Sequence, residues 1–436
     1  MSSLELAPLT FCTIMYWAVH TDDLDDTDEL ADLLEDALLA FLLIKKMEAE
    51  NNQAISERQN LRESNSVWRG AHTPHVNKAH KKMRELLAAP DEYFRNICRV
   101  RQDAFKKLVF WLRTNTTARN TRFRLELKLM VFLYMLGHGA TQRNAAMFFH
   151  MGQASVHRVF HELRRAMVHL HKAYVVQPDR SYVSDKLLSH RKYDPFVGAI
   201  GAIDGTHFEA FIPVKDQEKF WNRKGKVTQN VLAACTLDGL FTYVMAGAEG
   251  SFNDSALLAQ ACSRSLKVPD GRYYLADAGF GSNRVGFLTP VPGQVRYHLQ
   301  EFGRHDLRPA NADELYNLRH SSLRMIIEQV FGRLKRRWRI TRSGPPEYSF
   351  RDQIAIIYIV TALQNFIALQ GQLPDEAWRD AIARDSAREA RRRARHRERA
   401  DRKCTGMRGR DLRDVIKKQV WVDYRNVLAK RAMNGI

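Results

Sequence analysis

The fold is decided by one stretch, FVGAIGAID at residues 196–204, an apolar run that ends in a carboxylate and is followed by Gly205. Such a run is typical of a strand buried on both faces. Two further apolar runs lie in NVLAACTLDGLFTYVMAGA, residues 230–248, and the Asp238-Gly239 pair between them is typical of a hairpin turn. A fourth run, GRYYLAD at 271–277, again ends in aspartate. With helices expected at 255–263, 321–338 and 354–369, this order predicts a mixed α/β layer fold.

A helical region precedes the strands, because apolar side chains recur at helical spacing from Asp91 to Leu112 and over 125–136. Residues 141–149 and 155–167 then predict two short helices, capped by Thr141 and Ser155 and joined by a turn at Met151-Gly152. This pattern is typical of a helix-turn-helix whose second helix reads DNA, and equally of a plain helical subdomain. The candidate DNA contacts on the second helix are Arg158 and Arg164.

Pattern and composition divide the chain into four parts. Residues 1–80 form an acidic head and polar linker, 81–190 the helical region, 191–373 the α/β domain, and 374–436 a basic, arginine-rich tail with a terminal helix. An amphipathic helix and a disordered arm are both open for the acidic residues 22–36.

Charge points to a polyanionic partner. The chain carries +19 at pH 7, and its first fifty residues hold 12 carboxylates against 2 lysines, so the rest of the chain carries +29. An acidic head with a basic body and tail is typical of a protein that handles nucleic acid, although a surface that only keeps the chain soluble gives the same balance.

Several classes of protein are disfavoured by the sequence. The five cysteines are odd in number, far apart and without zinc spacing, which favours a reducing compartment over a disulfide framework. Residues 1–9 lack the basic region of a signal peptide. The uncharged stretch 354–373 is interpreted as a buried core helix, because polar residues interrupt it, and no membrane partner is expected.

Three carboxylates are candidate catalytic groups. Asp204 and Asp277 each end an apolar strand and precede a glycine-containing turn, which directs a charge from a sheet edge into a cleft. Glu328 lies in the middle of an apolar helix. Singly, each has an ordinary structural explanation, since the aspartates could form turns and Glu328 could pair with Arg324. Converging carboxylates, however, repel one another unless divalent cations neutralise them. Two such ions would suit displacement at phosphorus.

The helix of Glu328 carries cations on the same face. Positions −4 and +7 from Glu328 lie within about 40° of it on a helical wheel, and they are Arg324 and Lys335. These side chains are spaced to hold DNA phosphates, as are the neighbouring Arg336 and Arg337. Arg223 and Lys224, in the basic turn before the second strand, are further candidate DNA contacts.

Five segments together resemble the consecutive conserved blocks of the PIF/Harbinger DDE transposases and their domesticated nuclease relatives. They are AIDGTHF (202–208), NRKGKVTQNVLAACTLDG (222–239), GSFNDSALL (250–258), YLADAGF (274–280) and RMIIEQVFGRLKRRW (324–338). The likeness is close over about 200–369 and looser from Asp91 onward. Any one block is weak, whereas five in the family's order are specific. The acidic head and the tail lie outside it.

The resemblance implies an RNase H-like catalytic domain in which Asp204, Asp277 and Glu328 form the DDE triad. Asp254, in the GSFNDS segment, is then a further metal-pocket carboxylate, with a helix N-cap as the alternative. Two Mg²⁺ or Mn²⁺ ions are implied as cofactors. Related bacterial transposases have a Tyr-Arg-Glu-Lys signature that Arg324, Glu328 and Lys335 fit. Ser321 stands at the tyrosine position, so the role of that tyrosine is not carried over.

By the same resemblance, the chain is expected to be a transposase. It would hydrolyse phosphodiesters at the ends of its element and transfer the freed 3′-hydroxyl into target DNA. A domesticated nuclease and a DNA-binding regulator without catalysis are the alternatives. A Myb-like accessory protein, homo-oligomers and a nuclear location are implied, and the run at 391–395 could be a nuclear-import signal.

Overall fold

The computed structural model describes residues 74–281, 283–293, 309–342, 348–370 and 391–433. Contacts between residues divide the chain into two compact units, 1–73 and 74–436, and only the second is described. The acidic head therefore lies outside the described residues, and with it the choice between an amphipathic helix and a disordered arm at 22–36, as do 374–390 of the tail.

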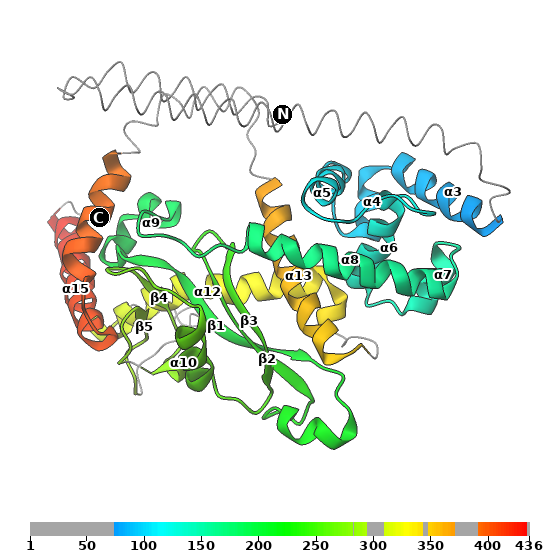
Figure 1. Cartoon of the computed structure of the whole chain (residues 1–436). Coiled ribbons are helices and arrows are strands. Elements are labelled where there is room, and N and C mark those ends of the chain that lie inside the picture. The colour runs from blue at the N-terminus through cyan, green and yellow to red at the C-terminus, as the bar shows by residue number, and fades with distance from the viewer. Residues whose placement is uncertain (1–73, 282, 294–308, 343–347, 371–390, 434–436) are drawn as a thin grey trace, which may run out of the picture. The chain divides into compact units, whose positions relative to one another are not determined.

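The helical region opens the second unit (Figure 1). This region begins at Pro74, within the segment that was predicted to be a linker. Its second and third helices are separated at Arg99, which has a left-handed backbone conformation with a φ of 63°. These early helices are α3 (Pro74–Ala88), α4 (Asp91–Cys98), α5 (Gln102–Asn115) and α6 (Leu125–His138).

The predicted pair of helices is present, with one correction. Helix α7 (Gln142–Phe148) is capped by Thr141, whose hydroxyl accepts a hydrogen bond from the Asn144 amide, as predicted. Helix α8 (Gln153–Tyr174) begins earlier and ends later than predicted, with Gly152 rather than Ser155 at its N-cap. It is longer because its apolar stripe continues past Met167 and packs along α6 and α13 (Phe350–Gln370).

The α/β part is built on one mixed five-stranded sheet with the order β3-β2-β1-β4-β5. The strands β1, β2 and β3 are antiparallel neighbours, whereas β4 and β5 run parallel to β1. Their bounds are β1 (Ala199–Glu209), β2 (Thr228–Cys235), β3 (Phe241–Glu249), β4 (Tyr273–Leu275) and β5 (Phe287–Leu288). The predicted mixed sheet with flanking helices is confirmed, including the hairpin at Asp238-Gly239, where Gly239 has a φ of 89°.

Strand β1 is longer than its apolar run. It pairs with β2 from Ala202 to Glu209, so Asp204 lies in the middle of the strand, opposite Ala233. The prediction that Asp204 ends the strand is therefore wrong, because backbone pairing continues where the apolar pattern stops. Conversely, β4 ends at Leu275, two residues before Asp277, and the short strand β5 was not predicted.

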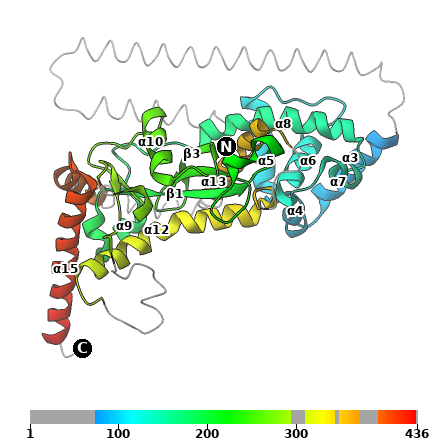
Figure 2. The same cartoon turned by 90° about the horizontal axis from the view of Figure 1, so that it is seen from below.

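Helices cover both faces of the sheet (Figure 2). Helix α10 (Asp254–Arg264) packs on one face of the sheet, where Leu257 and Leu258 join Ile203 of β1 and Leu232 of β2 in a buried cluster. Helices α12 (Ala312–Arg337) and α13 cover the other face. Helix α13 is long and apolar enough to cross a membrane, yet 72% of its most apolar window is buried inside the protein, which confirms the predicted core helix.

The remaining elements are short or C-terminal. Residues 391–404 are helical, and α15 (Gly409–Met433) packs against α12, which confirms the predicted terminal helix. The short elements are α9 (Asp185–Ser189), η2 (Arg191–Phe196), η3 (Val214–Phe220), η4 (Ala278–Phe280) and η5 (Arg339–Thr341).

Candidate active site

Asp204 sits at the centre of the site. Its side chain is 20% exposed, and its Oδ2 accepts a hydrogen bond from Arg324 at 3.2 Å. Its Oδ1 accepts from the Gly205 amide at 2.9 Å. The pKa of Asp204 is raised to about 6, mainly by burial and further by the charges of Asp277 and Asp254, against the lowering effect of Arg324. Asp204 is therefore a carboxylate under repulsion from two others.

Glu328 is tied to Asp204 through Arg324. The Arg324 side chain is 8% exposed, and its second guanidinium nitrogen donates to Glu328 Oε1 at 2.6 Å. The ordinary explanation for Glu328, an ion pair one helical turn away, is thus present. Because the same guanidinium also binds Asp204, that pair belongs to the site, and Glu328, 53% exposed, faces it from the solvent side.

Asp254 approaches β1 from the N-terminus of α10. The N-cap of α10 is Asn253, which accepts from the Ala256 amide, so the alternative role of Asp254 as the cap is wrong. Asp254 Oδ1 instead accepts from Asn230 Nδ2 at 3.3 Å. A Cβ atom on Gly205 would lie only 2.4 Å from Asp254 Oδ1. The carboxylate therefore rests against the backbone of the residue that follows Asp204.

Asp277 reaches the same region from β4. Leu275 of β4 pairs in parallel with Ala202 of β1. Asp277 and Asp204 each come two residues after this pair, so they occupy equivalent positions along the two neighbouring segments. Asp277 stands at the N-cap of η4, yet its side chain makes no capping hydrogen bond there. It is half-buried, and its charge helps to raise the pKa of Asp204.

The donor chemistry fits a divalent cation. Carboxylate oxygens are the ligands that Mg²⁺ and Mn²⁺ prefer, and the repulsion on Asp204 is what a cation relieves. The Oδ1 atom of Asn230 is buried without a hydrogen-bond partner, and a Cβ on Gly205 would lie 3.5 Å from it. Within the described ranges, no three His, Cys, Asp or Glu side chains already stand close enough to hold a metal ion.

Two of the basic side chains of α12 that were predicted to contact DNA instead form hydrogen bonds within the protein. Lys335 donates to Thr206 Oγ1 at 2.8 Å and to the His207 carbonyl at 2.9 Å, and burial lowers its pKa. Arg337 donates to Gln364 Oε1 at 3.1 Å. Arg336 is exposed.

The other predicted DNA contacts likewise include both exposed side chains and one that is paired within the protein. Arg158 is exposed on α8, whereas Arg164 forms an ion pair with Asp352 of α13 at 2.7 Å. Arg223 and Lys224 are exposed in the turn before β2. The structure thus brings Asp204, Asp254, Asp277 and Glu328 to one region. Arg158, Arg223 and Lys224 form no hydrogen bond or ion pair with these carboxylates among the contacts of the described residues.

Two site residues were not singled out from the sequence. Asn230 orients Asp254, and Gly205 makes room for it. Asn230 follows two other polar residues, Thr228 and Gln229, at the start of β2, so no local sequence signal distinguishes it.

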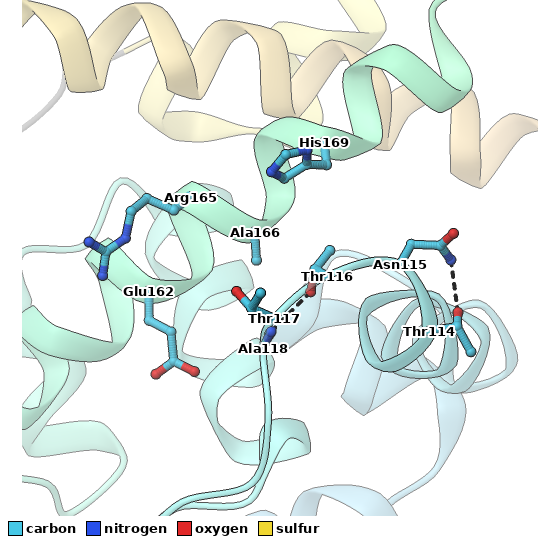
Figure 3. A pocket seen from close by; sticks show the side chains of 9 residues that line it. All are labelled: Thr114, Asn115, Thr116, Thr117, Ala118, Glu162, Arg165, Ala166 and His169. Atoms are coloured by element: carbon cyan, nitrogen blue, oxygen red, sulfur yellow. Dashed lines mark hydrogen bonds between the residues drawn. The ribbon is translucent and has the colours of Figure 1, made fainter. Parts of the chain in front are cut away.

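A separate hollow of about 500 Å³ lies in the helical region (Figure 3). It is lined by the loop after α5 and by one stripe of α8, including Thr116, Glu162, Arg165 and His169. Lys128 fixes Glu162 through hydrogen bonds of 2.8 Å. None of the predicted site residues lines this hollow, so it is distinct from the carboxylate site.

Comparison with known proteins places the carboxylates in a known family segment. Residues 203–365 match the family described as DDE superfamily endonuclease, which indicates nuclease activity and implies use of a divalent metal. Residues 75–169 match a domain of unknown function, DUF8040.

Distant relatives of the chain are also found among curated protein sequences. The chain is 25% identical over 260 residues to a Rattus norvegicus protein named "Putative nuclease HARBI1", covering 57% of this chain and 69% of the relative. The Homo sapiens protein of that name is 25% identical over 261 residues, with the same coverage. The Xenopus laevis protein is 24% identical over 264 residues, covering 59% of this chain and 71% of the relative. No solved structure matches.

Proposed function

We propose that this chain, whose residues 203–365 match the DDE superfamily endonucleases, is a metal-dependent transposase or nuclease acting on DNA phosphodiesters. The observation that carries the proposal is the joining of Asp204 and Glu328 by Arg324 while Asp254 and Asp277 raise the pKa of Asp204. Asp204, Asp277 and Glu328, from three separate elements of an RNase H-like sheet domain, would then hold the metal ions that act on one substrate phosphate, and Asp254 lies across β1 from Asp204.

Each carboxylate has a role in this scheme. Asp204 and Asp277 would hold both metals, Glu328 the second, and Asp254 would complete the pocket from the other side of β1. Mg²⁺ or Mn²⁺, with two ions expected, supplies positive charge that activates the attacking oxygen and stabilises the leaving one. Arg324 keeps Asp204 and Glu328 in position. Lys335 holds the part of β1 that follows Asp204 by hydrogen bonds to Thr206 and His207.

The proposed substrate is the pair of DNA ends of a mobile element, followed by target DNA that accepts the freed 3′-hydroxyl. The net charge of +19 favours such a polyanion. A nuclear location, a homo-oligomer and a Myb-like accessory protein belong to the same proposal. A domesticated nuclease with the same chemistry is the second candidate, favoured by the likeness to the proteins named "Putative nuclease HARBI1".

The test is cleavage of a labelled oligonucleotide duplex that carries the terminal repeats flanking the gene, with Mg²⁺ or Mn²⁺. Asp204→Asn, Asp277→Asn and Glu328→Gln should each reduce cleavage by about 10³-fold, because each weakens metal stabilisation worth several kcal/mol. Glu218→Gln, an exposed carboxylate of η3, is the control and should cleave normally. Full cleavage by Asp277→Asn would contradict the triad.

Products separate the candidates. A transposase joins the 3′ end of the labelled strand to a target plasmid, whereas a nuclease yields only hydrolysed strands. If the purified chain binds the duplex and neither cleaves nor joins it, the chain is the DNA-binding regulator and the proposed activity is wrong.

A further inference from the structure

A rigid basic turn stands between β1 and β2. Trp221 and Val227 form an isolated antiparallel bridge, and the Asn222 amide donates to the Lys226 carbonyl at 2.9 Å. Asn222 Oδ1 accepts from the amides of Lys224 and Lys226 at 2.9 and 3.1 Å. Gly225 has a φ of 67°. We call residues 221–227 the Trp221 turn. Its backbone and Asn222 hold it in one shape, so its side chains are presented in fixed directions.

The side chains of the Trp221 turn suit an unpaired nucleotide. Trp221 is 50% exposed, although it is the largest apolar side chain type. Arg223 and Lys224 are exposed beside it, and neither side chain has an ion pair or hydrogen bond among the contacts found in the described ranges. Lys226 is held by Glu209 at 2.9 Å. An indole face with free cations beside it is how proteins bind single-stranded nucleic acid, by base stacking and phosphate contacts.

The Trp221 turn and the end of η3 just before it are anchored on the two segments that carry Asp204 and Asp254. The Ala210 amide, just after β1, donates to the Val227 carbonyl at 3.1 Å. On the other side, Ser251 donates through its hydroxyl to the Lys219 carbonyl at 2.9 Å, shortly before Asp254. A Cβ on Gly250 would lie 2.3 Å from the Phe220 carbonyl oxygen, so the two segments are in close contact.

Electrostatics agree with this placement. Burial lowers the pKa of His207, three residues after Asp204 on β1, and Asp254 raises it. Lys335, Lys224 and Arg223 lower it as well, so the cations of the turn and the Asp254 carboxylate act on one imidazole. Together with the hydrogen bonds from Ala210 and Ser251, this places the turn next to the segments that carry Asp204 and Asp254.

We propose that Trp221 stacks on an unpaired base of the DNA next to the cleaved phosphodiester, with Arg223 and Lys224 on the neighbouring phosphates. This inference rests on the proposed function, because it gives the substrate of that site a locally unpaired strand. Exposed aromatic residues standing alone are common, and Phe110 of α5, 67% exposed, is one. Trp221 differs by its rigid turn, its free cations and its position.

The test compares binding of fluorescein-labelled dT20 with binding of a 20-bp duplex, using the full chain without divalent metal. Trp221→Ala should weaken dT20 binding about tenfold, since one stacked base supplies that much affinity, and change duplex binding less than twofold. Trp221→Phe should restore most of it. Phe110→Ala is the matched control and should bind both probes normally. Unfolding midpoints of all variants establish that each is folded.

The salt dependence of dT20 binding distinguishes phosphate contacts from base stacking. Replacing Arg223 and Lys224 together by alanine should reduce the salt dependence of dT20 binding by about 1.4 in the log–log slope, at 0.7 per phosphate contact. Lys418→Ala, an exposed lysine of α15, should leave that slope unchanged.

The two proposals fail differently. If Trp221→Ala binds dT20 as tightly as the unmodified chain, or loses duplex and dT20 affinity equally, the stacking inference is wrong while cleavage by the carboxylates can still stand. If Trp221→Ala loses dT20 binding and the unmodified chain cleaves nothing, stacking stands and the proposed activity is wrong.

Discussion

Asp204 of β1 and Glu328 of α12 are joined through a single guanidinium group, because Arg324 donates to one carboxylate at 3.2 Å and to the other at 2.6 Å. Arg324 thereby supplies positive charge at the centre of a group of carboxylates. The two acids are far apart in the chain, and their union depends on α12 packing across the face of β1.

Replacement of Arg324 tests this union. Arg324→Ala should raise the pKa of Asp204 above 6, because it removes the main charge that lowers it, and should reduce cleavage by about 10- to 100-fold, as loss of an orienting partner does. Arg324→Lys cannot donate to both carboxylates in the same way and should stay impaired. The pKa is measured by carboxyl-carbon NMR. Gln329→Ala, exposed on the same helix and outside the predicted DNA contacts, is the control, and an unchanged pKa in Arg324→Ala would contradict the bridge.

The raised pKa of Asp204 predicts a specific pH dependence of stability. Its folded pKa of about 6 exceeds the ordinary 3.8, so the folded state binds more protons between these values. Stability should therefore fall as pH rises from about 4 to 6, by about 3 kcal/mol from this group alone. Urea unfolding at pH 4, 5, 6 and 7.5 measures it. Asp204→Asn should abolish that part of the fall and be the more stable protein at pH 7.5. Equal slopes for both proteins would refute the assignment.

Gly205 is predicted to be as sensitive to substitution as Asp254. A methyl group there would meet Asp254 Oδ1 at 2.4 Å, so Gly205→Ala must displace Asp254 from Asn230. We expect Gly205→Ala and Asp254→Asn to reduce cleavage by similar factors, about 10- to 100-fold, with DNA affinity unchanged. Gly279→Ala is a matched control, because a Cβ there meets nothing within 4 Å. Normal cleavage by Gly205→Ala would show that Asp254 is dispensable.

Local sequence patterns account for part of this fold and of its site. The apolar runs placed the central strands, and the charges that follow or interrupt them identified Asp204 and Asp277. The end of β1 was misplaced because strand length follows pairing with β2, which one segment cannot reveal. The cap of α10 was misassigned by one residue, since Asn253 and Asp254 are both good caps and only the fold decides which faces β1.

Tertiary contacts explain the remaining differences. The helical wheel correctly placed Arg324 and Lys335 on one face of α12, but it does not show which other elements pack on that face. The two side chains were therefore predicted to contact DNA, whereas they form hydrogen bonds with β1. The role of Asn230 depends on α10 and β2 meeting, which no local pattern encodes.

The two arginines of α8 are predicted to act differently. Arg158 is exposed, so Arg158→Ala should weaken DNA binding and lower the log–log salt slope by about 0.9 for one phosphate contact. Arg164 pairs with Asp352 at 2.7 Å, and both side chains are largely buried. Arg164→Ala should therefore destabilise the protein by about 3 kcal/mol, because it leaves a buried charge without its partner.

Duplex binding and urea unfolding separate the two outcomes. The double variant with Asp352→Ala should regain part of the lost stability. If Arg158→Ala changes neither affinity nor salt slope, α8 serves only as packing for α13.

Some arginines of the tail are predicted to stabilise the fold and others to contact DNA. Arg393 donates to the Val183 carbonyl at 2.9 Å, and Arg392 donates to the Leu188 carbonyl, so these two attach the helix at 391–404 to the body of the protein. Arg391 and Arg395 are exposed. Replacing both by alanine should remove two phosphate contacts and lower the log–log salt slope of duplex binding by about 1.8, with stability unchanged.

The same double variant also tests nuclear import. If the tail is an import signal as well as a DNA clamp, a fluorescent fusion of the variant should lose nuclear accumulation, whereas a clamp alone leaves its location unchanged. Arg393→Ala is the contrasting control, because it should lower the unfolding midpoint before it affects the salt slope. Deleting the whole segment would confuse these effects, since Asp401 also pairs with Arg272 at 2.9 Å. A double variant with normal salt slope and normal location would show that the exposed arginines only face solvent.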